Sequence, residues 1–364
     1  MVYKKEQIIK ALSDVIFFPK SNNIIALNMV ENIEIKDNII NISIGFPKLG
    51  DPAINIVKNA SIKAIKDKVD KNAEVNIIAV VETKQGSLSG IKNIVAVASG
   101  KGGVGKSMVA ANLAIALQKS GAKVGLLDAD IYGPSIPIMF NLENERPSVI
   151  DKNGKTLIVP INKYGISVLS IGFFVEPEKA LIWRGPMASK ALNQLFNDSD
   201  WGELDYLIID LPPGTGDIHL TLAQSYPMTG AIIVTTPQQV AMADVRKAAN
   251  MFQQEQIKIP ILGLIENMSY FTPAELPNNK YYIFGKGNGK QFAESLKVPF
   301  LGQIPLIQYI SESGDKGNPI VLNDNFPVSE VFMKLADSLK KQIYNLISTK
   351  NNNNGFRRKI RINK

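Results

Sequence analysis

The sequence predicts an α/β fold in which a doubly wound, mostly parallel sheet carries helices on both faces and follows a small α/β domain. From Ile91 onward, apolar runs of the kind found in doubly buried strands alternate with helical segments, which is typical of a parallel sheet between two helix layers. A glycine-rich segment lies between the first of these strands and the next helix. The first 82 residues have a pattern of their own, and 364 residues are enough for two domains.

The small N-terminal domain is expected to comprise residues 1–82. Helices are predicted at 5–12 and 52–68, and strands at 33–36, 39–44 and 75–81. The second helix has a favourable start, because Asp51 suits the N-cap and Pro52 suits the first helical position. Residues 83–90 are polar and contain glycine and serine, so we interpret them as a linker.

The larger domain is expected to span residues 91–345. Strands are predicted at 94–99, 124–128, 166–171, 206–210, 231–235, 261–266 and 300–304. In such a sheet, ligands bind at the carboxyl ends of the strands. An asparagine run and a cluster of basic residues follow, so residues 346–364 are predicted to be a disordered basic tail.

The segment from Gly100 to Ser107 reads GKGGVGKS, which is the spacing of a phosphate-binding loop. Glycines reach positive φ at little cost, so successive backbone N–H groups turn toward an anion, and the following helix N-terminus adds partial positive charge. Lys106 is expected to reach the β- and γ-phosphates of a nucleoside triphosphate, and Ser107 the magnesium ion. The predicted nucleotide-binding residues are Gly100, Lys101, Gly102, Gly103, Val104, Gly105, Lys106 and Ser107. A glycine-rich turn that binds nothing is the alternative, but the strand-loop-helix setting favours a P-loop NTPase fold.

Three aspartates that follow two predicted strands are candidates for magnesium binding and catalysis. Asp210 ends an apolar strand, as does the Walker B carboxylate that enters a magnesium shell, and the Pro-Pro-Gly-Thr-Gly after it suits a switch that senses the γ-phosphate. Asp128 and Asp130 point the same way if the chain is extended, so one of them could orient the attacking water or bind magnesium water. We assign Asp128 to magnesium and Asp130 to catalysis. A loop-capping role for Asp130 is the alternative.

Lys101 is a second lysine inside the loop, where it adds charge and side-chain entropy to a tight turn. Within one chain it would only crowd Lys106. We therefore expect Lys101 to reach the phosphates of a facing subunit and to stabilise the charge that develops in phosphoryl transfer, as an arginine finger does. This makes Lys101 and Lys106 catalytic candidates and predicts a homodimer.

The composition limits the partners and the location. The formal net charge is +8, but 35 of the 41 basic residues are lysines spread along the chain, whereas nucleic-acid readers concentrate their charge and use arginine. Nucleic-acid binding is therefore not expected. Because no apolar run is long enough to cross a membrane and the first residues lack a signal-peptide stretch, we expect a cytoplasmic protein without membrane association.

The chain contains no cysteine and one histidine, His219. Disulfides, thiolate zinc sites and iron–sulfur clusters held by the chain's own thiolates are therefore excluded. A single histidine excludes a multi-histidine metal site within one chain, and we assign His219 no catalytic role. The ten methionines are scattered and are interpreted as core-filling residues.

Several motifs together resemble the Mrp/ApbC family, P-loop ATPases of the deviant Walker A group known as iron–sulfur cluster carriers. The motifs are SGKGGVGKS at 99–107, LLDADIYGPS at 126–135, IWRGPM at 182–187, WGELDYLIIDLPPGTGD at 201–217 and ENMSYF at 266–271. The resemblance covers about residues 91–340. The N-terminal domain resembles the small domain that bacterial Mrp proteins often carry and that also occurs alone in cluster-assembly factors.

The resemblance implies a homodimeric ATPase that converts ATP to ADP and phosphate with Mg²⁺, and that has apoprotein clients and cluster-scaffold proteins as partners. It implies that Lys101 is the signature lysine acting across the dimer and that Asn267 contacts adenine. It places Asp128 and Asp130 in a first switch, and Asp210 and Asp217 in a second. An iron–sulfur cluster is implied by the resemblance alone.

The sequence departs from the family where a CxxC usually follows the ENMSYF segment, because residues 272–277 read TPAELP. Thiolates favour iron and its sulfides, and Glu275 is a poor substitute. The sequence therefore favours an ATPase of iron–sulfur cluster assembly or delivery, with thiolates supplied by a partner protein. The alternative is an ATP-dependent spatial organiser resembling MinD or ParA, which would need an amphipathic anchor or a concentrated basic surface.

Overall fold

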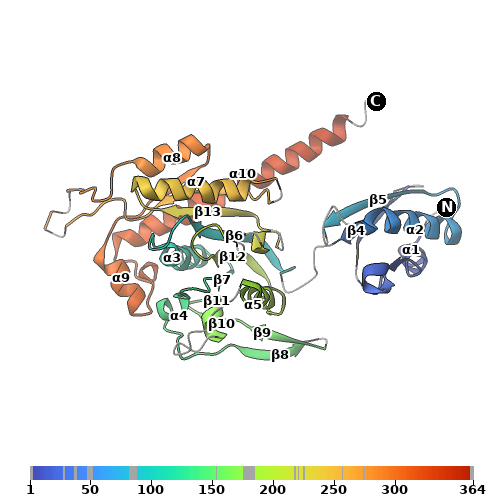
Figure 1. Ribbon diagram of the computed structural model, residues 1–364, viewed down its shortest axis with the longest axis horizontal. Helices are drawn as coiled ribbons and strands as arrows, with labels where there is room; N and C mark the ends of the chain where they lie inside the picture. The colour runs from blue at the N-terminus through green and yellow to red at the C-terminus, as the bar shows by residue number, and fades with distance from the viewer. Residues whose placement is uncertain are drawn as a thin grey trace. The chain divides into compact units, whose positions relative to one another are not determined.

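The computed structural model describes residues 3–27, 29–36, 39–46, 52–81, 88–152, 154–174, 185–216, 219, 221–223, 226–255, 257–273, 275–276 and 278–360. The chain divides into two compact units, Met1–Gln85 and Gly86–Lys364. This division falls inside the segment 83–90, which the sequence predicts to be a linker. Each unit is drawn in Figure 1 and is described by itself below.

The described residues of the N-terminal unit form a three-stranded sheet, a two-stranded sheet, two α-helices and one short 3-10 helix. Its elements are α1 (Lys5–Leu12), β1 (Ile16–Phe17), η1 (Phe18–Lys20), β2 (Asn22–Asn23), β3 (Val30–Lys36), β4 (Ile39–Phe46), α2 (Ala53–Lys68) and β5 (Glu74–Val81). The central strand β4 pairs antiparallel with β3 and parallel with β5. Every second residue of β4 is buried, namely Ile40, Ile42 and Ile44, as the period of a half-buried strand requires. The predicted N-cap of α2, Asp51, lies outside the described residues.

The larger unit is built on an eight-stranded sheet in the order β10-β11-β7-β12-β6-β13-β14-β15. The strands are β6 (Ile91–Ser99), β7 (Val124–Asp128), β10 (Ile161–Lys163), β11 (Ile166–Ser170), β12 (Leu204–Asp210), β13 (Gly230–Thr235), β14 (Ile261–Glu266) and β15 (Phe300–Gln303). All neighbouring pairs are parallel except β10 with β11. The predicted doubly wound, mostly parallel sheet is confirmed. Edge strand β10 and the hairpin β8 (Ser148–Lys152) and β9 (Lys155–Val159) were not predicted.

Helices cover both faces of this sheet (Figure 1). The helices of this unit include α3 (Lys106–Lys119), α4 (Ile136–Met139), α5 (Gly185–Asn197), α7 (Gln239–Gln253), α8 (Asn288–Leu296), α9 (Gln308–Asp315) and α10 (Pro327–Ile360). The side chains of β6 alternate between two cores: Val95 and Val97 pack with α3 and α10, whereas Ile94 and Ala96 pack with α5 and the end of α7. Burial on both faces explains why the strand is apolar at successive positions.

Helix α10 corrects one prediction. The disordered tail was expected to begin at residue 346, but the helix continues to Ile360 and extends beyond the sheet in Figure 1. Residues 328–354 contain neither proline nor glycine, so nothing in this stretch stops a helix that has already been nucleated against the core, and the helix continues through Gly355. Within the described part of the chain, none of the helices combines the length and the apolar character that a membrane crossing requires.

Candidate functional site

The glycine-rich segment connects the end of β6 to the start of α3. Gly103 and Gly105 have φ angles of 77° and 80°, in the left-handed region that favours glycine. Gly105 is also the N-cap of α3, so the loop ends directly on the positive end of the helix. Other segments pack closely against both ends of the loop. A Cβ atom on Gly100 would lie 2.3 Å from the backbone of Asp244, and a Cβ atom on Gly105 would lie 2.3 Å from Nδ2 of Asn267.

Lys106, the first residue of α3, is buried beneath this loop. Its Nζ donates a hydrogen bond of 2.6 Å to Oδ1 of Asp210 and lies 3.4 Å from Oδ2 of Asp130. The same ammonium lies 3.3 Å from the hydroxyl of Ser107. The structure thus brings together four residues that the sequence predicted for one site, and places the lysine between two carboxylates.

Asp128 and Asp210 are neighbours because they end adjacent parallel strands, β7 and β12, in register. Both carboxylate oxygens of Asp128 accept hydrogen bonds. Oδ1 accepts one from the N–H of Asp130 at 3.1 Å. Oδ2 accepts one from the hydroxyl of Ser170 at 2.9 Å and one from the N–H of Ile136 at 3.2 Å. Burial, with the nearby Asp210 charge second, raises the pKa of Asp128 to about 8. This geometry favours Asp128 as an anchor of the loop after β7, and its predicted magnesium role stays a prediction.

Asp210 has a different environment. Burial raises the pKa of its carboxyl group, and the ammonium of Lys106 opposes that shift. Its Oδ2 atom is buried and accepts no hydrogen bond from the described residues. A carboxylate oxygen with unused acceptor capacity beside the Ser107 hydroxyl fits a magnesium ion, which binds few protein oxygens and keeps several waters. The described residues contain no group of three or more acidic, histidine or cysteine side chains placed to hold a metal ion.

The segment that follows β12 is hydrogen-bonded to β6, the strand that leads into the phosphate loop. Leu211 N–H donates to the carbonyl of Val97, and Gly214 N–H donates to the carbonyl of Ser99. The buried ring of His219 lies with Nε2 2.8 Å from the carbonyl of Pro212, and burial lowers its pKa. Asp217 and the segment Ile182–Arg184 of a quoted motif lie outside the described residues.

Lys101 contacts its own chain. Its Nζ donates a hydrogen bond of 3.1 Å to Oε1 of Gln238, which directly precedes α7. Its backbone carbonyl accepts the hydroxyl of Ser99 at 2.9 Å. The sequence did not point to Gln238. The predicted role of Lys101 across a homodimer stays a prediction.

Asn267 follows β14 and is buried against the loop. Its Nδ2 donates to the carbonyl of Val104 at 2.8 Å, and its backbone N–H donates to the carbonyl of Thr235 at 2.7 Å. The residue before it, Glu266, accepts the N–H of Gly289 at 2.6 Å and Nε2 of Gln303 at 2.7 Å, and so fixes the start of α8. Glu266 was predicted only as a strand end, because nothing in its local sequence marks it as an anchor.

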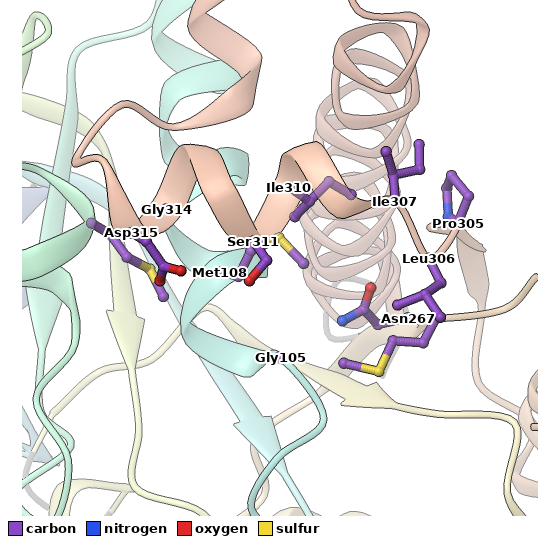
Figure 2. A pocket seen from close by; sticks show the side chains of 12 residues that line it. Gly105, Met108, Asn267, Pro305, Leu306, Ile307, Ile310, Ser311, Gly314 and Asp315 are labelled. Atoms are coloured by element: carbon purple, nitrogen blue, oxygen red, sulfur yellow. The ribbon is translucent and has the colours of Figure 1, made fainter. Parts of the chain in front are cut away.

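A pocket of about 210 Å³ opens beside Asn267 and the loop (Figure 2). Its wall is mostly apolar, with a few polar groups. It is formed by Gly105, Met108, Met139, Asn267, Met268, Pro305, Leu306, Ile307, Ile310, Ser311, Gly314 and Asp315. Apolar walls with a few fixed polar groups suit a flat aromatic ligand. The sequence predicted Asn267 and Gly105 here but missed the rest, because the wall is assembled from segments that are distant in the chain.

A parallel sheet with a glycine-rich phosphate loop between its central strand and a helix, and with aspartates at the ends of the two next strands, defines a P-loop NTPase. The comparisons with known proteins give the family. Residues 90–340 match the family described as NUBPL iron-transfer P-loop NTPase, and the chain belongs to it. Residues 5–77 match a family described as iron-sulfur cluster assembly protein. The resemblance read from the sequence is confirmed.

Relatives with high identity carry consistent names. The chain is 44% identical over 329 residues to the iron-sulfur cluster carrier protein of Haemophilus influenzae, covering 88% of this chain and 87% of that protein. It is 42% identical over 332 residues to the protein of the same name from Escherichia coli, covering 89% and 88%. Among solved structures, a nucleotide-binding protein from Archaeoglobus fulgidus in complex with ADP has 39% identity and a TM-score of 0.58, covering 68% of this chain and 94% of that chain.

The segment where the resemblance implies a CxxC is closed by a pair of backbone hydrogen bonds. The segment 272–277 lies between residues that pair across it, since Phe271 and Tyr281 exchange two backbone hydrogen bonds of 2.8 Å. Neither this segment nor any other part of the chain contains a cysteine. The residues present therefore do not suit an iron–sulfur cluster, whose iron prefers thiolate ligands.

Proposed function

We propose that this protein binds and hydrolyses ATP with Mg²⁺ as a homodimer, and that it serves the assembly of iron–sulfur clusters or their delivery to apoproteins. The cluster is the cargo of this function, and its thiolate ligands come from a partner, a client or a scaffold protein, because this chain has none. The observation that carries the proposal is the buried ammonium of Lys106, held between Asp210 and Asp130 directly below the glycine-rich loop. The cytoplasmic location expected from the sequence stays a prediction.

The ion pair suggests how nucleotide binding engages the site. A polyphosphate in the loop offers Lys106 stronger acceptors than a single carboxylate, so its ammonium turns from Asp210 to the β- and γ-phosphates. Asp210 and the Ser107 hydroxyl are the residues that would hold Mg²⁺, and the ion would supply charge neutralisation at the phosphates. Asp130, which already lies 3.4 Å from the same ammonium, orients the attacking water.

The pocket beside the loop supports ATP as the nucleotide. The Nδ2 atom of Asn267 donates one of its two N–H groups to the carbonyl of Val104, and Oδ1 is the group that we expect to meet a ligand. An acceptor in that position matches the exocyclic amino group of adenine and not the carbonyl oxygen of guanine. We propose that adenine occupies this pocket between Met108 and Leu306, with ATP preferred over GTP.

Titration calorimetry with Mg-ADP and phosphate-release assays with Mg-ATP test the nucleotide chemistry. Wild type should bind Mg-ADP and hydrolyse ATP faster than GTP, and Lys106→Ala should lose hydrolysis by on the order of 10²–10³-fold. Lys334→Ala, which changes an exposed lysine paired with Glu330 on α10, is the matched control and should act as wild type. Full turnover in Lys106→Ala would show that the site does not work as proposed.

Anaerobic reconstitution with iron and sulfide tests the cargo. The chain alone should develop no cluster absorption, whereas addition of a cysteine-bearing scaffold protein loaded with a cluster should give an ATP-dependent transfer to an apoprotein acceptor. Cluster formation on the chain alone would contradict the assignment of the thiolates to a partner.

A further inference from the structure

Three of the ten methionines line the pocket: Met108, Met139 and Met268. Figure 2 labels Met108 on the wall of the pocket, and Met139 and Met268 also belong to its lining. All three are partly exposed, so they are open to small molecules that enter the pocket. By contrast, Met29 and Met251 are buried in the cores, as the sequence predicts for methionine. The pocket therefore concentrates reachable thioether sulfur at one place.

The three side chains come from three separate segments: helix α3, helix α4 and the loop after β14. Met108 is in the first turn of α3, next to the phosphate loop, where a Cβ atom on Gly105 would lie 3.7 Å from its terminal methyl group. Met139 ends α4 and borders α9, where a Cβ atom on Gly314 would lie 3.9 Å from its Cγ. The methionines of the pocket thus come from different parts of the chain that the fold brings to one lining.

Met268 is fixed in place by its neighbours. Its φ angle is 55°, in the left-handed region that residues other than glycine seldom adopt. On one side Asn267 is bound to the carbonyl of Val104, and on the other the hydroxyl of Ser269 donates to the carbonyl of Glu266 at 2.8 Å and contacts that of Ile304 at 3.1 Å. The backbone is therefore anchored on both sides of Met268, and a change in its side chain must be accommodated inside the pocket.

We propose that these pocket methionines are an oxidant-sensitive modification site, and that their conversion to methionine sulfoxide weakens nucleotide binding. The inference rests on the proposed function, since it takes the pocket to hold the adenine base. In the reaction, the thioether sulfur attacks a peroxide oxygen, a sulfur–oxygen bond forms, the O–O bond breaks and water leaves, so that sulfur is oxidised and peroxide is reduced. Methionine sulfoxide reductases, with thiols as reductant, reverse the change.

The chemistry of the pocket wall explains why oxidation of these methionines should weaken nucleotide binding. Reduced methionine makes favourable sulfur contacts with an aromatic ring, and the sulfoxide replaces them with a polar S=O group. Its oxygen is a hydrogen-bond acceptor in a wall that already presents the acceptors Asn267 Oδ1 and the Asp315 carboxylate. A bound base would bury this group with few donors available, so binding loses affinity. Because the chain has no cysteine, methionine is its readily oxidised sulfur.

The test compares reduced and oxidised protein. Wild type is treated with hydrogen peroxide, the sulfoxides are located by peptide mass spectrometry, and the Kd for Mg-ADP is measured by calorimetry. Oxidation of the pocket methionines should raise Kd by about tenfold or more, and treatment with methionine sulfoxide reductases should restore it. The triple variant Met108→Leu, Met139→Leu, Met268→Leu should keep its affinity after peroxide, because leucine is apolar and is not oxidised.

The matched control is Met187→Leu, which removes a methionine that is 53% exposed and does not line the pocket. This variant should lose affinity on oxidation as wild type does. Pocket sulfoxides without a change in Kd, or an equal loss in the triple leucine variant, would overturn the inference. If untreated wild type bound no Mg-ADP, the proposed function itself would fail, so the two failures are distinguishable.

A second measurement needs no variant, and it tests the inference even if the triple variant does not fold. Peroxide is added to wild type with and without saturating Mg-ADP, and sulfoxide is quantified at each methionine. The nucleotide should protect Met108, Met139 and Met268 several-fold while Met187 is oxidised equally in both samples. Equal oxidation of the pocket methionines with and without nucleotide would contradict the placement of the base against them.

Discussion

The side-chain amide of Asn267 donates a 2.8 Å hydrogen bond to the backbone carbonyl of Val104, and so ties the end of β14 to the phosphate loop. The contact is possible because the next residue, Gly105, has no side chain: a Cβ atom there would lie 2.3 Å from the same amide nitrogen. Gly105 also has a φ of 80°, which a residue with a Cβ atom adopts only with strain. One glycine therefore satisfies both the loop conformation and the approach of Asn267.

The first prediction follows from this relationship. Gly105→Ala should destabilise the nucleotide-free protein by about 1–3 kcal/mol through backbone strain and the displaced hydrogen bond, and should weaken Mg-ADP binding. Urea unfolding and calorimetry measure the two effects. Gly102→Ala is the control for stability, because its Cβ atom would meet nothing within 4 Å. An equal loss of stability in both variants would show that the Asn267 contact is irrelevant.

The second prediction concerns Asp210, the 2.6 Å partner of Lys106. Asp210→Asn keeps the shape of the side chain but removes the charge that we assign to the magnesium shell, so Mg-ATP hydrolysis should fall by on the order of 10²–10³-fold. Binding of ADP without magnesium should be preserved, since Lys106 keeps Asp130 as an ion-pair partner. Asp205→Asn, which removes a carboxylate paired with the exposed Lys92, should hydrolyse ATP as wild type does. Magnesium-dependent turnover that survived in Asp210→Asn would remove this residue from the metal site.

Much of the fold could be predicted because its strands have local patterns of apolar residues in the sequence. The seven strands predicted in the larger domain are all present, since apolar runs such as Ile94–Ala98 are typical of strands buried on both faces. Strand β8 was missed because it is exposed at every position, and edge strand β10 was missed because three residues are too few to show a period. The helical end of α10 was missed because asparagine and basic residues have the composition of a disordered segment.

The parts of the candidate site that lie within a single segment of the sequence could be predicted. The spacing of Gly100–Ser107 and the strand ends at Asp128 and Asp210 indicated where phosphate and magnesium chemistry would lie. The contacts of Asn267 with Val104, and of Lys101 with Gln238, join residues more than 130 positions apart, so no local pattern encodes them. The same is true of the pocket methionines, whose grouping depends on how two helices and a loop meet.

The third prediction is a pH dependence caused by Asp128. Burial raises its pKa from 3.8 to about 8 in the folded protein. Between about pH 4 and about pH 8, folded Asp128 keeps a proton that the unfolded chain has lost. Stability of the nucleotide-free protein should therefore fall as pH rises through this range, by at most about 1.4 kcal/mol per pH unit for one proton. It should stop falling on this account above about pH 8.

Asp128→Asn tests this dependence because asparagine does not titrate. Urea unfolding from about pH 5 to about pH 9 should show a shallower fall of stability in this variant than in wild type. Asp151→Asn, on the exposed strand β8, is the control and should keep the wild-type slope. Parallel pH profiles for wild type and Asp128→Asn would mean that this carboxyl group is ionised in both folded and unfolded states.

The last prediction concerns Lys101, which the structure holds within its own chain by a 3.1 Å hydrogen bond to Gln238. Under the proposed function this bond must break before Lys101 can reach the phosphates of a second subunit. A hydrogen bond from a charged donor to a neutral acceptor contributes about 1.5 kcal/mol, and one such bond breaks in each of the two subunits, so Gln238→Ala should strengthen ATP-dependent dimerisation by on the order of 10²-fold. Analytical ultracentrifugation with Mg-ATP and the hydrolysis-deficient Asp130→Asn background measures the dimer constant. Gln239→Ala, one residue further and exposed, should leave it unchanged, and weaker dimerisation in Gln238→Ala would indicate that Gln238 orients Lys101 for its partner and does not restrain it.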